Sequence, residues 1–304
     1  MRVFVTGATG FIGSAVVQDL LANGHQVIGL ARSDKSAAAL EKIGAGVVRG
    51  TTEDLDVLKA AAAAADGVIH TAYIHDFSPT ANPMAFAEID RNAIKAFGEA
   101  LAGTGKPLVV AAGLPGVAPG TIVTEDDKAP DNPPYPRFSE QAALALVDAG
   151  VRVSVVRMPP SVHGEGDPNF VLMLTRAALA KGFSAYAGEG ANTWPAVHRV
   201  DAGRLFRLAL EQAPAGTRLN AVGDEAVPFK DIAAAIGRSL NLPTKSVSAE
   251  DAAGHFGMPL ALFAQINAHA SGKRTREQFG WEPAEPGLIA DIDLGHYATA
   301  ASAH

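Results

Sequence analysis

A glycine-rich turn between the first predicted strand and the first predicted helix constrains this chain more than any other feature. Residues 2–7, RVFVTG, form a short β-branched apolar run that predicts a buried strand, and residues 13–24 carry apolar side chains at helical spacing. At such a junction the first glycine makes the tight turn, the second admits a pyrophosphate, and the third packs helix on strand. The predicted cofactor-binding residues of this turn are Gly7, Thr9, Gly10, Phe11, Ile12 and Gly13.

The same strand-then-helix rhythm continues as far as residue 160. The predicted strands share apolar, β-branched character: HQVIGLAR (25–32), GVVRG (46–50), DGVIHTA (66–72), KPLVVAAG (106–113) and VRVSVVRMPP (151–160). Helical patterns connect them through short links. This alternation predicts an α/β protein with a Rossmann-type, doubly wound parallel sheet.

After residue 160 the rhythm stops, and loop, helix and strand signals mix. We therefore expect a dinucleotide-binding Rossmann core at residues 1–160, to which residues 196–223 return. Residues 161–195 and 224–304 are expected to form a smaller C-terminal part that binds substrate. Ligands of doubly wound sheets bind outside the carboxyl ends of the strands.

Composition excludes several classes of protein. The chain has 304 residues, a net charge of −7 and no cysteine, so we expect no nucleic-acid partner, no anionic-membrane partner, no disulfide and no thiolate chemistry. The first residues lack a signal-peptide pattern and no apolar run reaches the roughly 18 residues of a membrane span. We expect a cytoplasmic protein. The histidines lack metal-ligand spacing, so no metal site is expected. Monomer and homodimer both stay open.

The end of the second predicted strand bears on the choice of cofactor. An NAD site usually places a carboxylate there to hold the ribose hydroxyls, whereas this chain has Ala31 followed by Arg32 and Ser33. A guanidinium beside a hydroxyl suits a 2′-phosphate. The sequence therefore favours NADP, although Asp34 argues mildly against it, and Arg32 as a plain solvated charge is the alternative.

Several longer phrases carry a family resemblance. They are TGATGFIG (6–13), VVRMPPSVHG (155–164), WPAVHRVDAGRLFRLAL (194–210) and TREQFGWEPAEPGLIADI (275–292). With the order of predicted elements, they resemble the short-chain dehydrogenase/reductase superfamily in its extended or atypical class, which includes sugar-nucleotide epimerases and dehydratases. The resemblance implies that backbone near the nicotinamide comes from Pro159 and Val162. The end of the fourth predicted strand is expected to line the cofactor site with His70, Thr71 and Ala72.

The catalytic set of that family is largely missing. It comprises an Asn, a Ser or Thr, and a Tyr followed four residues later by Lys. The resemblance implies Asn92 for the first, with an ordinary helix-face amide as the alternative, but Ala111 and Ala112 stand where the Ser belongs. No tyrosine is followed four residues later by a lysine; after Tyr135 that position holds Ser139. The chain thus resembles an atypical subgroup that lacks the Tyr-x-x-x-Lys motif.

Another alignment of the segment PPYPRFSEQA places Glu140 at the lysine position and Pro136 at the tyrosine position. Two tyrosines remain candidate proton donors. Tyr135 lies in this segment, with packing against the adjoining prolines as its alternative role, and Tyr73 follows the fourth predicted strand. A tyrosine of ordinary pKa near roughly 10 is protonated at neutral pH and can still donate to a forming alkoxide.

Three functions fit these observations. The first is an NADP-dependent short-chain dehydrogenase/reductase-like enzyme, with an atypical active site, that reduces a small carbonyl or imine substrate by hydride transfer from NADPH. The second is a sugar-nucleotide epimerase or dehydratase, and the third is a non-catalytic NADP-binding regulatory protein. An epimerase needs a base that removes a hydroxyl proton, so the missing Lys and Ser weigh most against it. The sequence favours the reductase.

Overall fold

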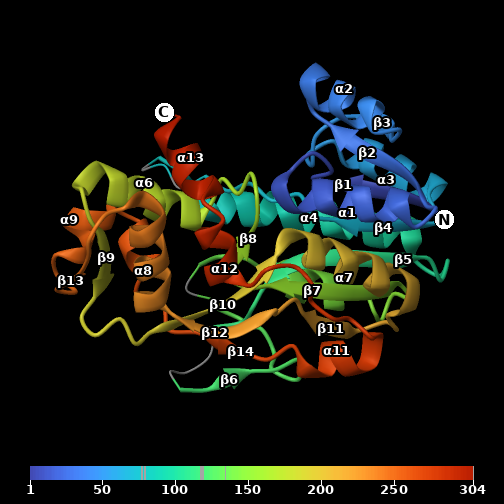
Figure 1. The fold of residues 1–304 in the computed structure, drawn as a ribbon. Coiled ribbons are helices and arrows are strands. Elements are labelled where there is room, and N and C mark those ends of the chain that lie inside the picture. Colours follow the sequence, from blue (N-terminus) through green and yellow to red (C-terminus); the bar gives the residue numbers. More distant parts are fainter. Residues whose placement is uncertain (77, 79, 117–119, 134, 304) are drawn as a thin grey trace.

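A seven-stranded parallel sheet forms the centre of the molecule (Figure 1). The structure, a computed structural model, describes residues 1–76, 78, 80–116, 120–133 and 135–303. The strands are β1 (Arg2–Thr6), β2 (Gln26–Ala31), β3 (Gly46–Arg49), β4 (Gly67–His70), β5 (Pro107–Gly113), β7 (Arg152–Met158) and β11 (Thr217–Asn220). Their order is β11-β7-β5-β4-β1-β2-β3. The predicted doubly wound fold is confirmed, and its order reverses between β1 and β4, where such sheets bind ligands.

Helices cover both faces of this sheet. On one face lie α1 (Phe11–Ala22) and α7 (Arg199–Gln212), which pack against each other (Figure 1). A Cβ at Gly203 would come within 2.9 Å of the Ala15 carbonyl carbon, so the glycine permits this close approach. The other face packs against α3 (Leu55–Ala64), α4 (Pro83–Leu101) and α5 (Ser139–Leu144), whose apolar side chains share one core with the strands. Helix α2 (Asp34–Lys42) links β2 to β3.

A second hydrophobic core lies in the C-terminal part of the chain. It is built mainly from α6 (Phe170–Lys181), α8 (Phe229–Leu240), α9 (Ala252–Phe256), α10 (Leu260–Phe263), α12 (Leu288–Asp293) and α13 (His296–Ser302). The rings of Phe170, Trp194 and Phe229 pack at its centre, with ring centroids 5.2–6.0 Å apart for the two Trp194 pairs. This core lies beside the large sheet rather than on it (Figure 1).

Three small sheets complete the fold. A three-stranded sheet contains β8 (Ser161–His163), β10 (Thr193–His198) and β12 (Asp224–Pro228), and two strand pairs unite β9 (Ser184–Ala187) with β13 (Thr244–Val247) and β6 (Ile122–Val123) with β14 (His269–Ala270). After α11 (Lys273–Phe279) the chain touches the large core again, where Trp281 is buried and donates to the Asp201 carbonyl at 2.9 Å. None of the described helices is both long and apolar enough to cross a membrane.

Candidate active site

The glycine turn has the geometry of an anion-binding loop. Gly7 has φ +67°, a left-handed conformation that favours glycine, and its carbonyl accepts from the Gly10 amide at 2.8 Å. A Cβ at Gly13 would lie 2.0 Å from the Gly7 oxygen, so no other residue fits there. Helix α1 begins after Gly10 without a capping side chain, which leaves the amides of its first turn available to phosphate oxygens.

The end of β4 lies against this loop. A Cβ at Gly7 would meet the Ala72 amide and the Thr71 hydroxyl at 2.7 Å, and the Thr71 hydroxyl donates to the Thr6 carbonyl at 2.8 Å. His70 is buried, with Nδ1 2.6 Å from the Thr6 hydroxyl and Nε2 3.1 Å from an Asp90 oxygen. Contact between His70 and a cofactor would therefore have to come from its backbone, while Thr71 and Ala72 lie closer to the surface.

Asp90, and not Asn92, is the polar side chain that α4 directs at the site. Asp90 is 5% exposed and accepts from the Ser139 hydroxyl at 2.7 Å, which completes a buried chain from Thr6 through His70 to α5. Asn92 is exposed. Residues two positions apart in a helix point in directions about 200° apart around its axis, so only one of Asp90 and Asn92 can face the sheet. The exposure of Asn92 fits its alternative role as an ordinary helix-face amide, whereas Asp90 lies in the buried network.

Arg137 lies at the end of β5, the position where the resemblance places the usual serine, and the sequence analysis did not single it out. Its Nη2 donates to the Ala111 carbonyl at 3.3 Å, at the end of β5, and its Nε lies 3.5 Å from the Ser139 hydroxyl. The guanidinium stacks on the Tyr73 ring, with Cζ 4.4 Å from the ring centroid. The one available signal was a cation beside Pro136, in a motif whose tyrosine and lysine are both replaced.

Both tyrosine candidates belong to the surroundings of Arg137. The Tyr73 hydroxyl donates to the Pro136 carbonyl at 3.2 Å, and burial raises the pKa of Tyr73 to about 12 although Arg137 opposes the rise. Burial also raises the pKa of Tyr135, whose buried hydroxyl has no hydrogen-bond partner among the described residues. Both phenols are therefore protonated at neutral pH. His75, whose ring centroid is 5.1 Å from that of Tyr73, is neutral there because burial and Arg137 lower its pKa to about 4.

Glu140, at the lysine position of the second alignment, points away from this cluster into an ion-pair network. Its Oε1 lies 2.7 Å from Arg157 Nη2 and 2.8 Å from Arg218 Nε, and its Oε2 lies 2.7 Å from Arg157 Nε. Burial favours the protonated acid, but the two guanidinium groups outweigh it and hold the pKa of Glu140 below its usual range. Glu140 thus ties α5 to β7 and β11 and leaves the lysine function unfilled.

This network yields a stability prediction. Glu140→Gln should lower the free energy of unfolding by about 3–5 kcal/mol, because it strands the fully buried Arg157 charge. Urea unfolding monitored by circular dichroism measures the change. Glu99→Gln, which removes an exposed pair with Lys59, is the matched control and should change the free energy of unfolding far less, because solvent screens an exposed ion pair. Equal effects of the two substitutions would show that the buried network contributes little.

The segment after β7 also approaches the glycine loop. Pro159 and Val162 are buried, and Val162 pairs with Val197 in the small sheet. Arg199 bridges this region to α1: its guanidinium lies 4.7 Å from the Phe11 ring centroid and donates to the Ser14 hydroxyl at 2.7 Å and the Glu165 carbonyl at 3.0 Å. Residues 159–166 therefore reach the start of α1.

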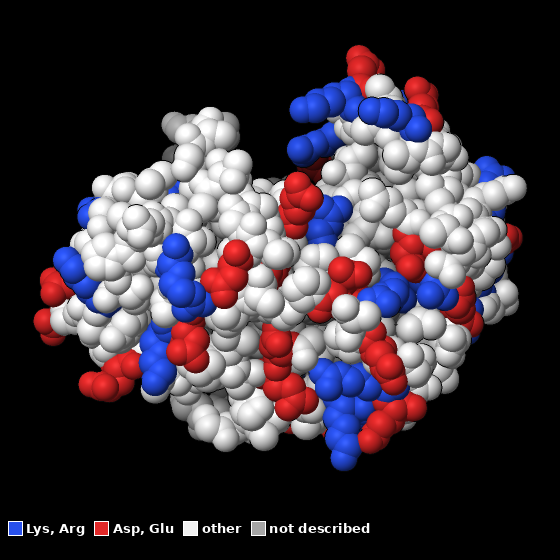
Figure 2. Space-filling model, viewed as in Figure 1, with Lys and Arg blue, Asp and Glu red and all other residues white. Residues whose placement is uncertain are grey.

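The end of β2 presents a free cation. Ser33 caps α2 by accepting from the Ser36 amide at 3.2 Å, and Arg49 binds the Ser33 carbonyl at 2.7 Å and Asp34 at 2.6 Å. Arg49 thereby neutralises the carboxylate that argued against NADP. Arg32 is exposed and has no ion pair with any described residue. Figure 2 shows basic side chains over this region, at the edge of a notch between the part with α2 and the part with α6 and α13.

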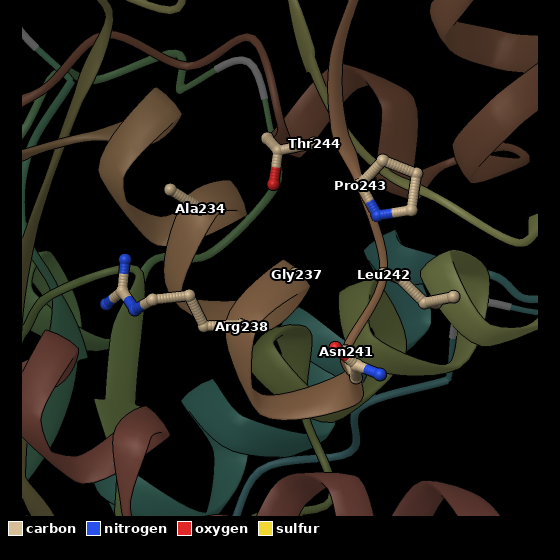
Figure 3. A pocket seen from close by; sticks show the side chains of 7 residues that line it. All are labelled: Ala234, Gly237, Arg238, Asn241, Leu242, Pro243 and Thr244. Atoms are coloured by element: carbon tan, nitrogen blue, oxygen red, sulfur yellow. The ribbon is translucent and has the colours of Figure 1, made fainter.

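Other parts of the surface offer less chemistry. A cavity of about 540 Å³ lies between the end of α8 and the start of β13 (Figure 3). Its charged lining residue, Arg238, points away from Leu242 and Pro243 and pairs with Asp293 at 2.9 Å. Among the described residues, no group of three or more His, Asp or Glu side chains could hold a metal ion.

Comparison with known proteins places this site in context. The model of the "NAD dependent epimerase/dehydratase family" matches residues 3–221. "Uncharacterized protein C2A9.02" of Schizosaccharomyces pombe is 46% identical over 299 residues, which cover 98% of this chain and 100% of the relative. A 4-hydroxy-2-methyl-3-oxo-4-farnesyl-3,4-dihydroquinoline-1-oxide ketoreductase of Stigmatella aurantiaca is 29% identical over 227 residues, covering 71% of this chain and 66% of that protein.

Solved structures show the same fold at lower sequence identity. DesIV, a dTDP-glucose 4,6-dehydratase of Streptomyces venezuelae with NAD and TYD bound, is similar with a TM-score of 0.79 and 20% identity, covering 99% of this chain and 97% of that chain. MoeE5 in complex with UDP-glucose and NAD gives a TM-score of 0.75 at 23% identity, covering 100% of both chains. Both similarities concern the arrangement of the backbone.

Proposed function

This chain belongs to the NAD dependent epimerase/dehydratase family, and from that premise we propose that it is an NADP-dependent reductase of a small carbonyl or imine substrate. The observation that carries the proposal is the cluster at the ends of β4 and β5, where two protonated tyrosines surround Arg137. The cluster keeps proton donors beside an intact glycine loop although the base-forming lysine is replaced. The relationship to a ketoreductase supports the same direction of chemistry.

The proposed reaction divides the work between cofactor and chain. NADPH, when bound, would supply the hydride for the substrate carbon, and the oxygen or nitrogen of the reduced double bond would then need a proton. The Tyr135 or Tyr73 hydroxyl then gives that atom a proton. The backbone of residues 159–162 would hold the nicotinamide end of the cofactor, and the glycine loop the pyrophosphate. Residues 161–195 and 224–304 would form the substrate-binding part across the notch.

A sugar-nucleotide epimerase or dehydratase is the second candidate, favoured by the family match and by DesIV. Such a reaction begins with removal of a hydroxyl proton, which requires a base. Here burial holds both tyrosines in the protonated form, and Glu140 is committed to Arg157 and Arg218. The reductase needs only the donor that the cluster retains. A non-catalytic NADP-binding protein is the third candidate, which the same assay separates.

The decisive assay follows NADPH absorbance with panels of ketones, aldehydes and cyclic imines. The expected result is consumption of NADPH with stoichiometric formation of the alcohol or amine. Parallel incubations with UDP-glucose and dTDP-glucose, analysed by chromatography, test the second candidate. Conversion of a sugar nucleotide without net NADPH consumption would replace the reductase by the epimerase or dehydratase. Cofactor binding without turnover of any compound would favour the regulatory protein.

The choice of cofactor depends on Arg32. In the wild type NADPH should bind more tightly than NADH, and Arg32→Ala should remove about 1–3 kcal/mol of that preference, the size of a hydrogen bond to a charged group. Calorimetry with both cofactors measures it. Lys35→Ala, a change of an exposed neighbour, is the control and should alter the preference far less. Equal affinities in the wild type would contradict the assignment of NADP.

A further inference from the structure

Arg137 is a partly buried cation without a counter-ion. It forms no ion pair with any described carboxylate, and both of its hydrogen bonds are long, at 3.3 Å and 3.5 Å. The acid nearest in the network, Asp90, is hydrogen-bonded to His70 and Ser139. Burial lowers the pKa of Arg137, which means that its charged form is poorly solvated. Buried charges are costly unless they are paired, so an anion at this place would be stabilised.

Comparison with Arg157 shows what is missing. Arg157 is fully buried and binds both oxygens of Glu140 at 2.7 Å, in addition to the Thr124 carbonyl at 3.1 Å. The same protein therefore satisfies a guanidinium completely where it serves the fold. At Arg137 one face is covered by the Tyr73 ring, and the hydrogen bonds of its guanidinium to described residues, through Nη2 and Nε, are both long. A planar guanidinium held in this way presents an edge that fits a carboxylate.

A second unsatisfied donor lies in the same cluster. The buried Tyr135 hydroxyl has no described partner, and Tyr135 and Arg137 interact electrostatically. Two neighbouring donors, one without an acceptor and one with only long hydrogen bonds, favour a ligand that supplies acceptor atoms to both. A compound with a carboxylate next to its carbonyl or imine group does so. One unpaired cation matches the single charge of a carboxylate better than the two or more charges of a nucleotide diphosphate.

We propose that the substrate is a carboxylate-bearing carbonyl or imine compound, whose carboxylate binds the guanidinium of Arg137 while its reducible group faces Tyr135. That the bound compound is a substrate rests on the proposed reductase function. The anion site itself is tested by binding alone. Arg137 acts here as a specificity-determining residue. It holds the acid group and orients the reducible bond toward the proton donor.

The test uses the full-length protein saturated with NADP⁺ and two probes of equal shape, phenylglyoxylate and its neutral amide. Calorimetry should show the acid binding at least about 10-fold more tightly than the amide, as expected for charge-assisted hydrogen bonds. Arg137→Gln should remove that preference, by about 10- to 100-fold in acid affinity, and leave amide affinity unchanged. Arg137→Lys should retain part of it. Arg2→Gln, a change of an exposed arginine at the amino end of β1, should behave as wild type.

The outcomes separate this inference from the proposed function. Equal affinity for the two probes in the wild type, including no measurable binding of either, overturns the carboxylate site. An equal loss of affinity for both probes in Arg137→Gln, with an unchanged melting temperature, also overturns it. That result would show that Arg137 binds the carbonyl oxygen of the probes instead. Binding of UDP that exceeds acid binding and disappears in Arg137→Gln would assign a diphosphate instead. Acid preference without NADPH consumption keeps the site and rejects the reductase, whereas reduction of neutral ketones without acid preference does the reverse.

Discussion

Gly10→Val should abolish dinucleotide binding in a protein that stays folded. At Gly10 an added Cβ would meet one protein atom, the Gly7 carbonyl oxygen at 3.1 Å, so the rest of its surroundings is open. That open space is where the pyrophosphate must approach the amides at the start of α1. A branched side chain fills it. Calorimetry with NADPH should therefore show a loss of affinity of more than about 100-fold, the loss of several charge-assisted hydrogen bonds.

The control for this prediction is Gly13→Ala in the same turn. Its Cβ would lie 2.0 Å from the Gly7 oxygen and 2.9 Å from the Thr71 hydroxyl, so the smaller substitution should lower the melting temperature more than Gly10→Val does. Together the two variants distinguish two roles of glycine. Gly10 leaves space for the ligand, whereas Gly13 permits the close packing of the protein backbone. Normal NADPH binding by the Gly10→Val variant would show that the dinucleotide does not bind at this turn.

The central sheet was predictable because its signals are local. Each strand of residues 2–160 is a short β-branched run, and the helical pattern between consecutive strands is long enough for a parallel crossover. The glycine turn was equally predictable, since the φ of +67° at Gly7 and the contact at Gly13 depend on residues within one turn of chain and the adjoining strand. Both features could therefore be predicted from local sequence patterns.

The cluster around Arg137 was not predictable because its contacts are distant in sequence. Arg137 becomes notable only once the Ala111 carbonyl, 26 residues earlier, lies beneath it. Glu140 becomes structural through Arg157 and Arg218, which lie 17 and 78 residues away. Which of Asp90 and Asn92 is buried depends on which face of α4 meets the sheet, and the sequence alone did not distinguish them. A motif match identifies a position in the sequence, whereas the packing of the helices and strands determines which side chain points into the site.

Proton transfer gives the second large effect, and Tyr135→Phe should show it. Turnover of NADPH-dependent reduction should fall by about 10²- to 10⁴-fold, the usual contribution of a positioned acid, with cofactor affinity unchanged. Tyr135 is the stronger candidate because its buried hydroxyl is unpartnered, whereas the Tyr73 hydroxyl already donates to the Pro136 carbonyl at 3.2 Å. Tyr73→Phe is therefore the matched variant, expected to cost less. Cofactor affinity is measured separately by calorimetry.

The dependence of turnover on pH provides an independent check of the same donor. A phenol donates only while protonated, and burial raises the pKa of both tyrosines, that of Tyr73 to about 12. Reduction should therefore proceed at a constant rate from roughly pH 6 to 9 and decline only above that range. His75 is neutral above its pKa of about 4, so a histidinium donor at that position would lose activity well before neutrality. Wild-type turnover in both phenylalanine variants, or a rate that falls between roughly pH 6 and 8, would assign the proton to water or to another acid.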